Sequence, residues 1–125
     1  MNLIHLAIQQ AVRSQCRHRM GAVLVAGSRV VVASPNRYRN SPSIDHRNST
    51  FHAEHAALRR ARGAPVSTVF VARVNAAHVP MLARPCPRCV EKLSRAGVVR
   101  AYYTAGPTTV EMLEIPEAAS SLVCT

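Results

Sequence analysis

The sequence predicts an α/β fold, with a single domain over residues 1–125 and three layers, α-β-α, around a mixed sheet of about five strands. Two observations lead to this prediction. Segments with apolar residues at helical spacing alternate with short β-branched segments, in the order α-β-β-α-β-α-β. The length of 125 residues suits one domain that can bury a core, and no repeat or low-complexity segment interrupts the pattern.

The first half of the chain predicts a helix, a hairpin and a long loop. Apolar residues recur at helical spacing from residue 3 to residue 12, and this helix is expected to end near Arg17. Residues 22–25 and 30–33 predict two strands joined by a turn that contains Gly27. The polar segment 34–50 holds two prolines and three asparagines, and it predicts a loop.

The second half of the chain predicts alternating helices and strands. Gly63 and Pro65 stop one helix, and Gly97 stops the next. Right-handed crossovers are expected to make the later strands parallel. The predicted elements are a helix over 52–62, a strand over 66–74, a variable loop over 75–84, a helix over 86–96 and a strand over 98–104.

The last segment predicts a strand over 110–115. Only residues 104–109 separate it from the preceding strand, which is too short for a crossover helix. The last strand should therefore run antiparallel to its predecessor. The alternative is a short helix over 110–122, broken at Pro116.

The composition indicates a soluble protein of the reducing cytoplasm. Hydrophobic residues make up 48% of the sequence, yet no apolar run approaches the length of a membrane span, and no signal segment opens the chain. The four cysteines include a closely spaced pair, which suits a metal site better than a disulfide framework. No membrane partner is expected.

Charge is the other prominent feature of the sequence. The net charge is +10, which favours partners that carry phosphate, either free nucleotides or nucleic acid. Aromatic residues for base stacking are scarce, at 4%. The candidates for phosphate contacts are four loop arginines: Arg37, Arg39, Arg47 and Arg84.

Two short motifs carry the candidate chemistry. The first is His52-Ala53-Glu54, and the second is the segment 85–89, Pro-Cys-Pro-Arg-Cys. Cys86 and Cys89 can turn toward one ion at a helix start, where the helix dipole lowers their pKa. His52 would complete a set of three zinc ligands and leave one tetrahedral position open, as in catalytic sites. Glu54 would then carry the proton of a zinc-activated water.

Each motif has a simpler interpretation by itself. A lone C-x-x-C pair is often a redox pair or half of a structural zinc site, and a lone H-x-E occurs often by chance. The presence of both motifs in one chain favours the catalytic interpretation. The remaining cysteines, Cys16 and Cys124, have no partner spacing and are predicted to be free thiols.

The two motifs together resemble the cytidine deaminase-like superfamily of zinc deaminases, and the resemblance covers about Met20 to Thr104. Histidine at position 52 resembles the deoxycytidylate, tRNA and polynucleotide branches. A final antiparallel hairpin, in contrast, resembles the free-nucleoside enzymes and some DNA-deaminating toxins. The resemblance implies a cytidine deaminase-like fold, zinc as cofactor and homo-oligomeric assembly.

The resemblance implies a hydrolytic deaminase that converts a cytosine-type base to the uracil form and releases ammonia. The expected substrate is a free nucleoside or nucleotide. Two alternatives stay open: a deaminase of single-stranded DNA or tRNA, and a zinc-stabilised binding module without catalysis. The residues expected to bind substrate are Asn36, Ala53, Arg37, Arg84 and Pro85, of which Asn36 follows the second strand where the resembled enzymes place a base- or sugar-binding asparagine.

Overall fold

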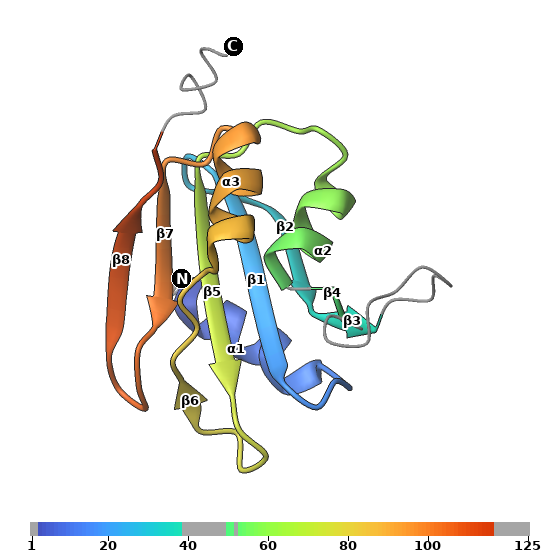
Figure 1. Cartoon of the computed structure of the whole chain (residues 1–125), viewed down its shortest axis with the longest axis vertical. Coiled ribbons are helices and arrows are strands. Elements are labelled where there is room, and N and C mark those ends of the chain that lie inside the picture. Colours follow the sequence, from blue (N-terminus) through green and yellow to red (C-terminus); the bar gives the residue numbers. More distant parts are fainter. Residues whose placement is uncertain (1–2, 39–49, 52, 117–125) are drawn as a thin grey trace.

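A six-stranded mixed sheet forms the middle of the molecule (Figure 1). The computed structural model describes residues 3–38, 50–51 and 53–116. The strand order is β2-β1-β5-β7-β8, and β6 pairs with β5. The strands of this sheet are β1 (Arg19–Ala26), β2 (Arg29–Pro35), β5 (Thr68–Val74), β6 (Pro80–Met81), β7 (Arg100–Thr104) and β8 (Val110–Glu114).

Helices cover both faces of this sheet. Helix α1 (Leu3–Arg13) packs on one face and contacts mainly β1 and β5. Helices α2 (Ala53–Ala61) and α3 (Pro87–Arg95) lie together on the other face (Figure 1). Two separate apolar clusters result, one beneath α1 and one beneath α2 and α3. The predicted three-layer α-β-α architecture is therefore confirmed.

The last hairpin has the strand directions that the sequence predicts. Strand β5 is parallel to β7, with α3 in the connection between them, whereas β8 is antiparallel to β7. The prediction of an antiparallel last strand is confirmed, and the alternative helix is wrong for residues 110–114. The pair β5 and β7 is the single parallel pair within the described residues.

Three predicted boundaries are wrong. The segment expected to be a loop, 34–50, contains the end of β2 and also β3 (Arg37–Tyr38), which pairs with β4 (Thr50–Phe51). The loop expected over 75–84 contains β6, so the sheet has six strands. Each of these pairings involves only two residues of each strand, and the β3–β4 pair also joins residues that lie far apart in the sequence. Local sequence patterns do not predict such pairings.

The third difference is the end of α1, which lies at Arg13 instead of near Arg17. The Ser14 hydroxyl accepts a hydrogen bond from the Cys16 N–H at 3.1 Å and donates one to the Asn36 side chain. A serine bonded in this way offers the backbone an alternative to another helical turn. The helix therefore ends where this long-range contact begins.

Gly21 fixes how closely α1 approaches the sheet. A Cβ atom at this position would lie 2.5 Å from the Ala11 nitrogen and 2.7 Å from the Gln10 Cβ, and still closer to the Ala7 carbonyl oxygen. The helix backbone thus rests directly on β1, and only glycine leaves room for it. Among the described residues, no helix is long and apolar enough to cross a membrane.

Candidate functional site

The candidate site lies where α2 and α3 begin. Glu54 lies in the first turn of α2, and Cys89 lies in the first turn of α3, after its N-cap residue Cys86. Both helices start at the same side of the α2–α3 layer (Figure 1). The positive ends of both helix dipoles therefore lie near these three side chains, where they stabilise thiolate and carboxylate groups.

The sequence around Cys86 gives α3 a defined start. Cys86 has an extended backbone, with φ of −75° and ψ of 164°, and its side chain does not cap the helix. Pro87 takes the first helical position, which suits its fixed φ and its missing N–H. The Val90 N–H closes the first turn on the Cys86 carbonyl oxygen at 2.9 Å. The Cys86 thiol therefore does not serve as the helix cap, which is compatible with metal binding.

The packing of α3 orients Cys89 toward the interior. Cys89 is 4% exposed, and Leu93, one turn later on the same side of the helix, is fully buried in the core. Leu93 therefore anchors the face of α3 that also carries Cys89. Glu54 is buried as well, with 1% of its surface exposed.

The three side chains interact with one another. The pKa of the Cys89 thiol lies well above its ordinary value, in contrast to the lowering expected from the helix dipole, because burial disfavours the thiolate. The nearby charges of Glu54 and Cys86 raise this pKa further. Hydrogen bonds between the Cys89 side chain and those of Cys86 and Glu54 act in the same direction. The predicted spacing has therefore brought the C-x-x-C pair and the carboxylate together.

This donor set fits a zinc ion. Two thiols and one carboxylate crowd a buried region, and their ionised forms require a compensating positive charge there. Thiolates at this spacing are typical zinc ligands. The described residues alone form no complete group of three metal ligands, and the predicted third ligand, His52, lies outside them.

The structure gives Asn36 a clear structural role. Its side-chain oxygen accepts hydrogen bonds from the Ser14 hydroxyl and, at 3.0 Å, from the Met20 N–H. Its amide nitrogen donates to the His18 carbonyl oxygen at 2.6 Å. The oxygen thereby uses both of its lone pairs inside the fold. A contact with substrate, which stays a prediction, would have to use the second amide hydrogen.

The other predicted substrate-binding residues are placed to different degrees. Ala53 is fully buried at the start of α2, and Pro85 is buried just before α3. Arg84 is exposed, and its guanidinium donates to the Tyr103 hydroxyl at 3.4 Å. Arg37 contributes its backbone to β3, and its side chain lies outside the described part of the structure. The same holds for the whole of Arg39 and Arg47.

Sequence reasoning missed two residues that are linked to the predicted substrate contact Arg84, namely Tyr103 and Glu111. They lie opposite each other in the β7–β8 pair, and the Tyr103 hydroxyl donates to Glu111 Oε1 at 3.1 Å. The antiparallel hairpin was itself predictable from its short connection. Its register would have placed these two residues together.

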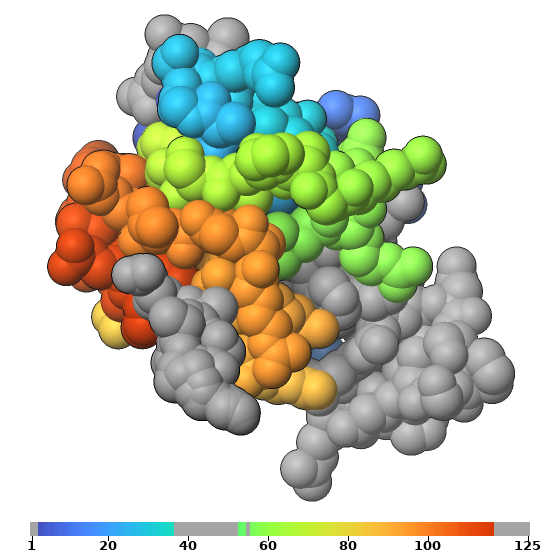
Figure 2. Space-filling view, turned by 90° about the horizontal axis from the view of Figure 1, so that it is seen from above, coloured from blue at the N-terminus to red at the C-terminus, as the bar shows by residue number. Residues whose placement is uncertain are grey.

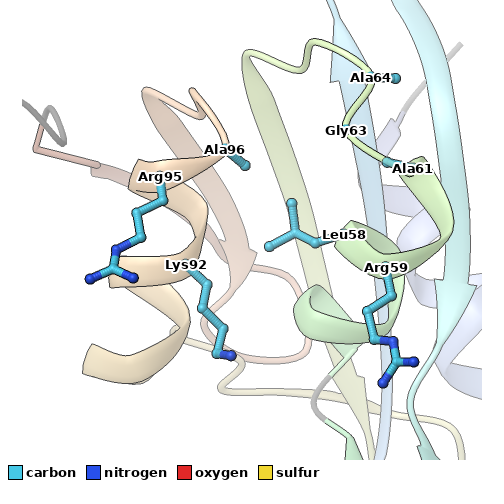
Figure 3. A pocket seen from close by; sticks show the side chains of 8 residues that line it. All are labelled: Leu58, Arg59, Ala61, Gly63, Ala64, Lys92, Arg95 and Ala96. Carbon is cyan, nitrogen blue, oxygen red and sulfur yellow. The ribbon is translucent and has the colours of Figure 1, made fainter.

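A separate groove lies between the carboxyl-terminal halves of α2 and α3 (Figure 3). Figure 2 looks down on this end of the molecule, where the two helices lie side by side. The groove holds about 450 Å³, and it lies at the opposite ends of the helices from the site. Its basic residues lie in the last turns of the helices, where the dipole favours them, so they need no ligand to explain them. Its lining residues are Leu58, Arg59, Ala61, Gly63, Ala64, Lys92, Arg95 and Ala96.

Comparison with known families gives one match that covers most of the chain. The model of the cytidine and deoxycytidylate deaminase zinc-binding region matches residues 1–105. None of the curated proteins matches the sequence significantly. The family match includes both motifs and the described starts of α2 and α3, and it implies zinc as the cofactor.

Several solved structures share the fold. Cytidine deaminase from Burkholderia pseudomallei has a TM-score of 0.70 and 19% identity, with 90% of each chain covered. dCMP deaminase from the cyanophage S-TIM5, in complex with dCMP and dUMP, has a TM-score of 0.60 and 21% identity, with 81% of this chain and 76% of that chain covered. Cytidine deaminase from Mycobacterium leprae has a TM-score of 0.57 and 15% identity, with 87% and 88% covered.

Proposed function

We propose that this chain, which belongs to the family of the cytidine and deoxycytidylate deaminase zinc-binding region, converts a cytosine-type base to the uracil form by zinc-dependent hydrolysis. The substrate is a free nucleoside or nucleotide, that is, cytidine, deoxycytidine or dCMP. Water replaces the exocyclic amine, which leaves as ammonia. The observation that carries the proposal is the buried Glu54 against Cys86 and Cys89 at two helix starts.

The proposed zinc ligands are His52, Cys86 and Cys89. Zinc, when bound, lowers the pKa of water and so supplies a nucleophile near neutral pH. Glu54 would take one proton from the attacking water and pass it to the ring nitrogen, and would then pass the remaining proton, from the newly formed hydroxyl, to the amine, which leaves as ammonia. Its burial supports this role, because a carboxylate screened from solvent exchanges its proton with the reactants rather than with bulk water.

The proposed substrate contacts come from the elements around this centre. Backbone N–H groups at a helix start point along the helix axis and can donate to a developing negative charge, and Ala53 and Cys86 occupy such positions. Pro85 shapes the pocket wall beside them. Asn36, Arg37 and Arg84 are the proposed contacts to the sugar or to a phosphate.

We further infer that the chain forms one domain over residues 1–125 and works as a cytoplasmic homo-oligomer. Exposed apolar side chains in or next to β6, β7 and β8 support association. These are Met81, Leu82, Val99, Val110 and Met112, with exposed fractions between 37% and 55%.

The test of the proposed function is a screen for release of ammonia by zinc-loaded protein. The substrates are nucleosides, nucleotides, free bases and single-stranded DNA. We expect release from a cytosine nucleoside or its monophosphate. Zinc-loaded, folded protein that releases ammonia from none of these compounds would contradict the proposal.

One observation favours a second candidate, a polynucleotide deaminase. The net charge of +10 would attract a phosphate backbone. Ammonia release from single-stranded DNA alone, with the nucleosides and monophosphates inert, would establish this candidate. A binding module without catalysis would hold zinc and show no turnover at all.

A further inference from the structure

Three side chains meet at one phenol oxygen, and one of them, Arg84, lies two residues before Cys86. The Tyr103 hydroxyl donates to Glu111 Oε1 at 3.1 Å and accepts from Arg84 Nη1 at 3.4 Å. Tyr103 is 2% exposed, whereas Arg84 and Glu111 are exposed. A buried phenol thus holds a guanidinium and a carboxylate at the surface, two hydrogen bonds apart. We call these residues the Arg84–Tyr103–Glu111 cluster.

The cluster lies on the same face of the sheet as the site. Tyr103 belongs to the apolar cluster beneath α2 and α3, and Glu111 is its direct partner across the β7–β8 pair. The segment that leads to Cys86 is attached to the end of β7, because the Ala83 N–H donates a hydrogen bond to the Thr104 carbonyl oxygen at 2.8 Å. Ligands of α/β folds bind outside the carboxyl ends of parallel strands, and Thr104 ends β7.

The chemistry of the cluster favours a hydroxyl over a phosphate. An isolated arginine would attract a phosphate, but here a carboxylate shares its phenol partner and offsets its charge. A phosphate dianion only accepts hydrogen bonds, so Glu111 would repel it. A sugar hydroxyl can donate to Glu111 and accept from Arg84, so it satisfies both groups at once.

We propose that Glu111 is a specificity-determining residue that favours an uncharged pyrimidine nucleoside over its monophosphate. Tyr103 is the positioning residue, because it holds Glu111 and Arg84 in place without reaching the surface. This inference rests on the proposed function and names the substrate class of the same site.

The test compares Glu111→Gln with a matched control, Glu114→Gln. Both changes remove one negative charge from β8, but residue 114 faces the opposite side of the sheet, across from Arg100. Glutamine at position 111 can still accept the hydrogen bond from Tyr103, so the variant should fold. Tyr103→Phe is the second variant, because it keeps the ring in the core and removes the shared oxygen.

Two readouts are measured for each protein. Calorimetry gives the affinities for uridine and uridine monophosphate, the deaminated products, and initial rates give kcat/KM for cytidine and cytidine monophosphate. We expect the wild type to prefer the nucleoside, and this preference to weaken at high salt. Glu111→Gln should reduce the preference about fivefold, the size of an exposed charge interaction. Tyr103→Phe should reduce it in part, and Glu114→Gln should leave it unchanged.

The outcomes separate this inference from the proposed function. Two results would overturn the inference alone, provided that the wild type releases ammonia. In the first, Glu111→Gln does not change the preference for the nucleoside over its monophosphate. In the second, Glu111→Gln and Glu114→Gln change this preference equally. A wild type that prefers the monophosphate would overturn it too. A shift in product binding confined to Glu111→Gln and Tyr103→Phe, without any ammonia release, would support the inference and contradict the proposed function.

Discussion

Replacing Gly21 by alanine should separate the stability of the fold from the chemistry of the site. Gly21 lies in β1 directly beneath α1, where a Cβ would lie 2.5 Å from the Ala11 nitrogen and 2.7 Å from the Gln10 Cβ. Nonbonded atoms prefer separations of about 3.5–4.0 Å, so the helix would have to withdraw from the sheet by about 1 Å. Since the obstructing atoms are mostly helix backbone, no rotamer change relieves the contact.

The expected loss is about 3 kcal/mol in the free energy of unfolding, at the upper end of the usual cost of overpacking. For a domain of this length, that loss lowers Tm by about 10 °C. The assay is urea unfolding of the zinc-loaded protein, followed by circular dichroism. The matched control is Gly106→Ala, whose Cβ would lie 4.0 Å from its nearest neighbour, Thr109 Oγ1, and whose cost should stay within about 0.5 kcal/mol.

The same variant should keep its zinc and its rate per folded molecule. Helix α1 lies on the opposite face of the sheet from α2 and α3, which carry Glu54, Cys86 and Cys89. Equal unfolding midpoints for Gly21→Ala and Gly106→Ala would refute the account of how α1 packs. A large loss of kcat in the folded Gly21→Ala protein would refute the separation between that helix and the site.

Three further predictions concern the metal, the substrate and the assembly. Cys86→Ala and Cys89→Ala should lose zinc and stability together, in metal analysis and thermal unfolding, because the binding energy of a buried ion is also folding energy. The control variant Cys16→Ala should keep its zinc. Full zinc occupancy in the double variant of Cys86 and Cys89 would exclude the proposed ligands. Rates are measured for a nucleoside, a monophosphate and an oligonucleotide at low and high salt, and we expect turnover of the nucleoside or the monophosphate. For a polynucleotide substrate, the logarithm of the binding constant would instead fall with the logarithm of the salt concentration, with a slope of about −0.7 per neutralised phosphate. Light scattering should show a homodimer or homotetramer, and a lone 13.6 kDa species at high concentration would contradict this.

The zinc motif and the order of elements were predictable because their signals are local. The C-x-x-C pair lies within one helical turn, and Pro87 and Gly97 mark the ends of α3 in the sequence itself. The short connection before β8 likewise forced an antiparallel strand. The sequence therefore predicted where Glu54, Cys86 and Cys89 would meet.

Long-range contacts were not predictable in the same way. The hydrogen bond of Ser14 to Asn36 spans 22 positions and ends α1 early, and no local pattern marks it. The pairing of Arg37 with Phe51 joins two ends of a polar segment that resembles a loop. The link from Arg84 to Glu111 through Tyr103 requires three elements to be in place at once.

The most direct test of the central claim is the zinc content and the rate of Glu54→Gln. The carboxylate is not a proposed ligand, so the variant should bind zinc as the wild type does and keep its fold. Its rate with the substrate found in the ammonia screen should fall by at least about 10² to 10⁴, because the proton carrier is lost. A zinc-loaded Glu54→Gln protein that turns over near the wild-type rate would contradict the proposed mechanism.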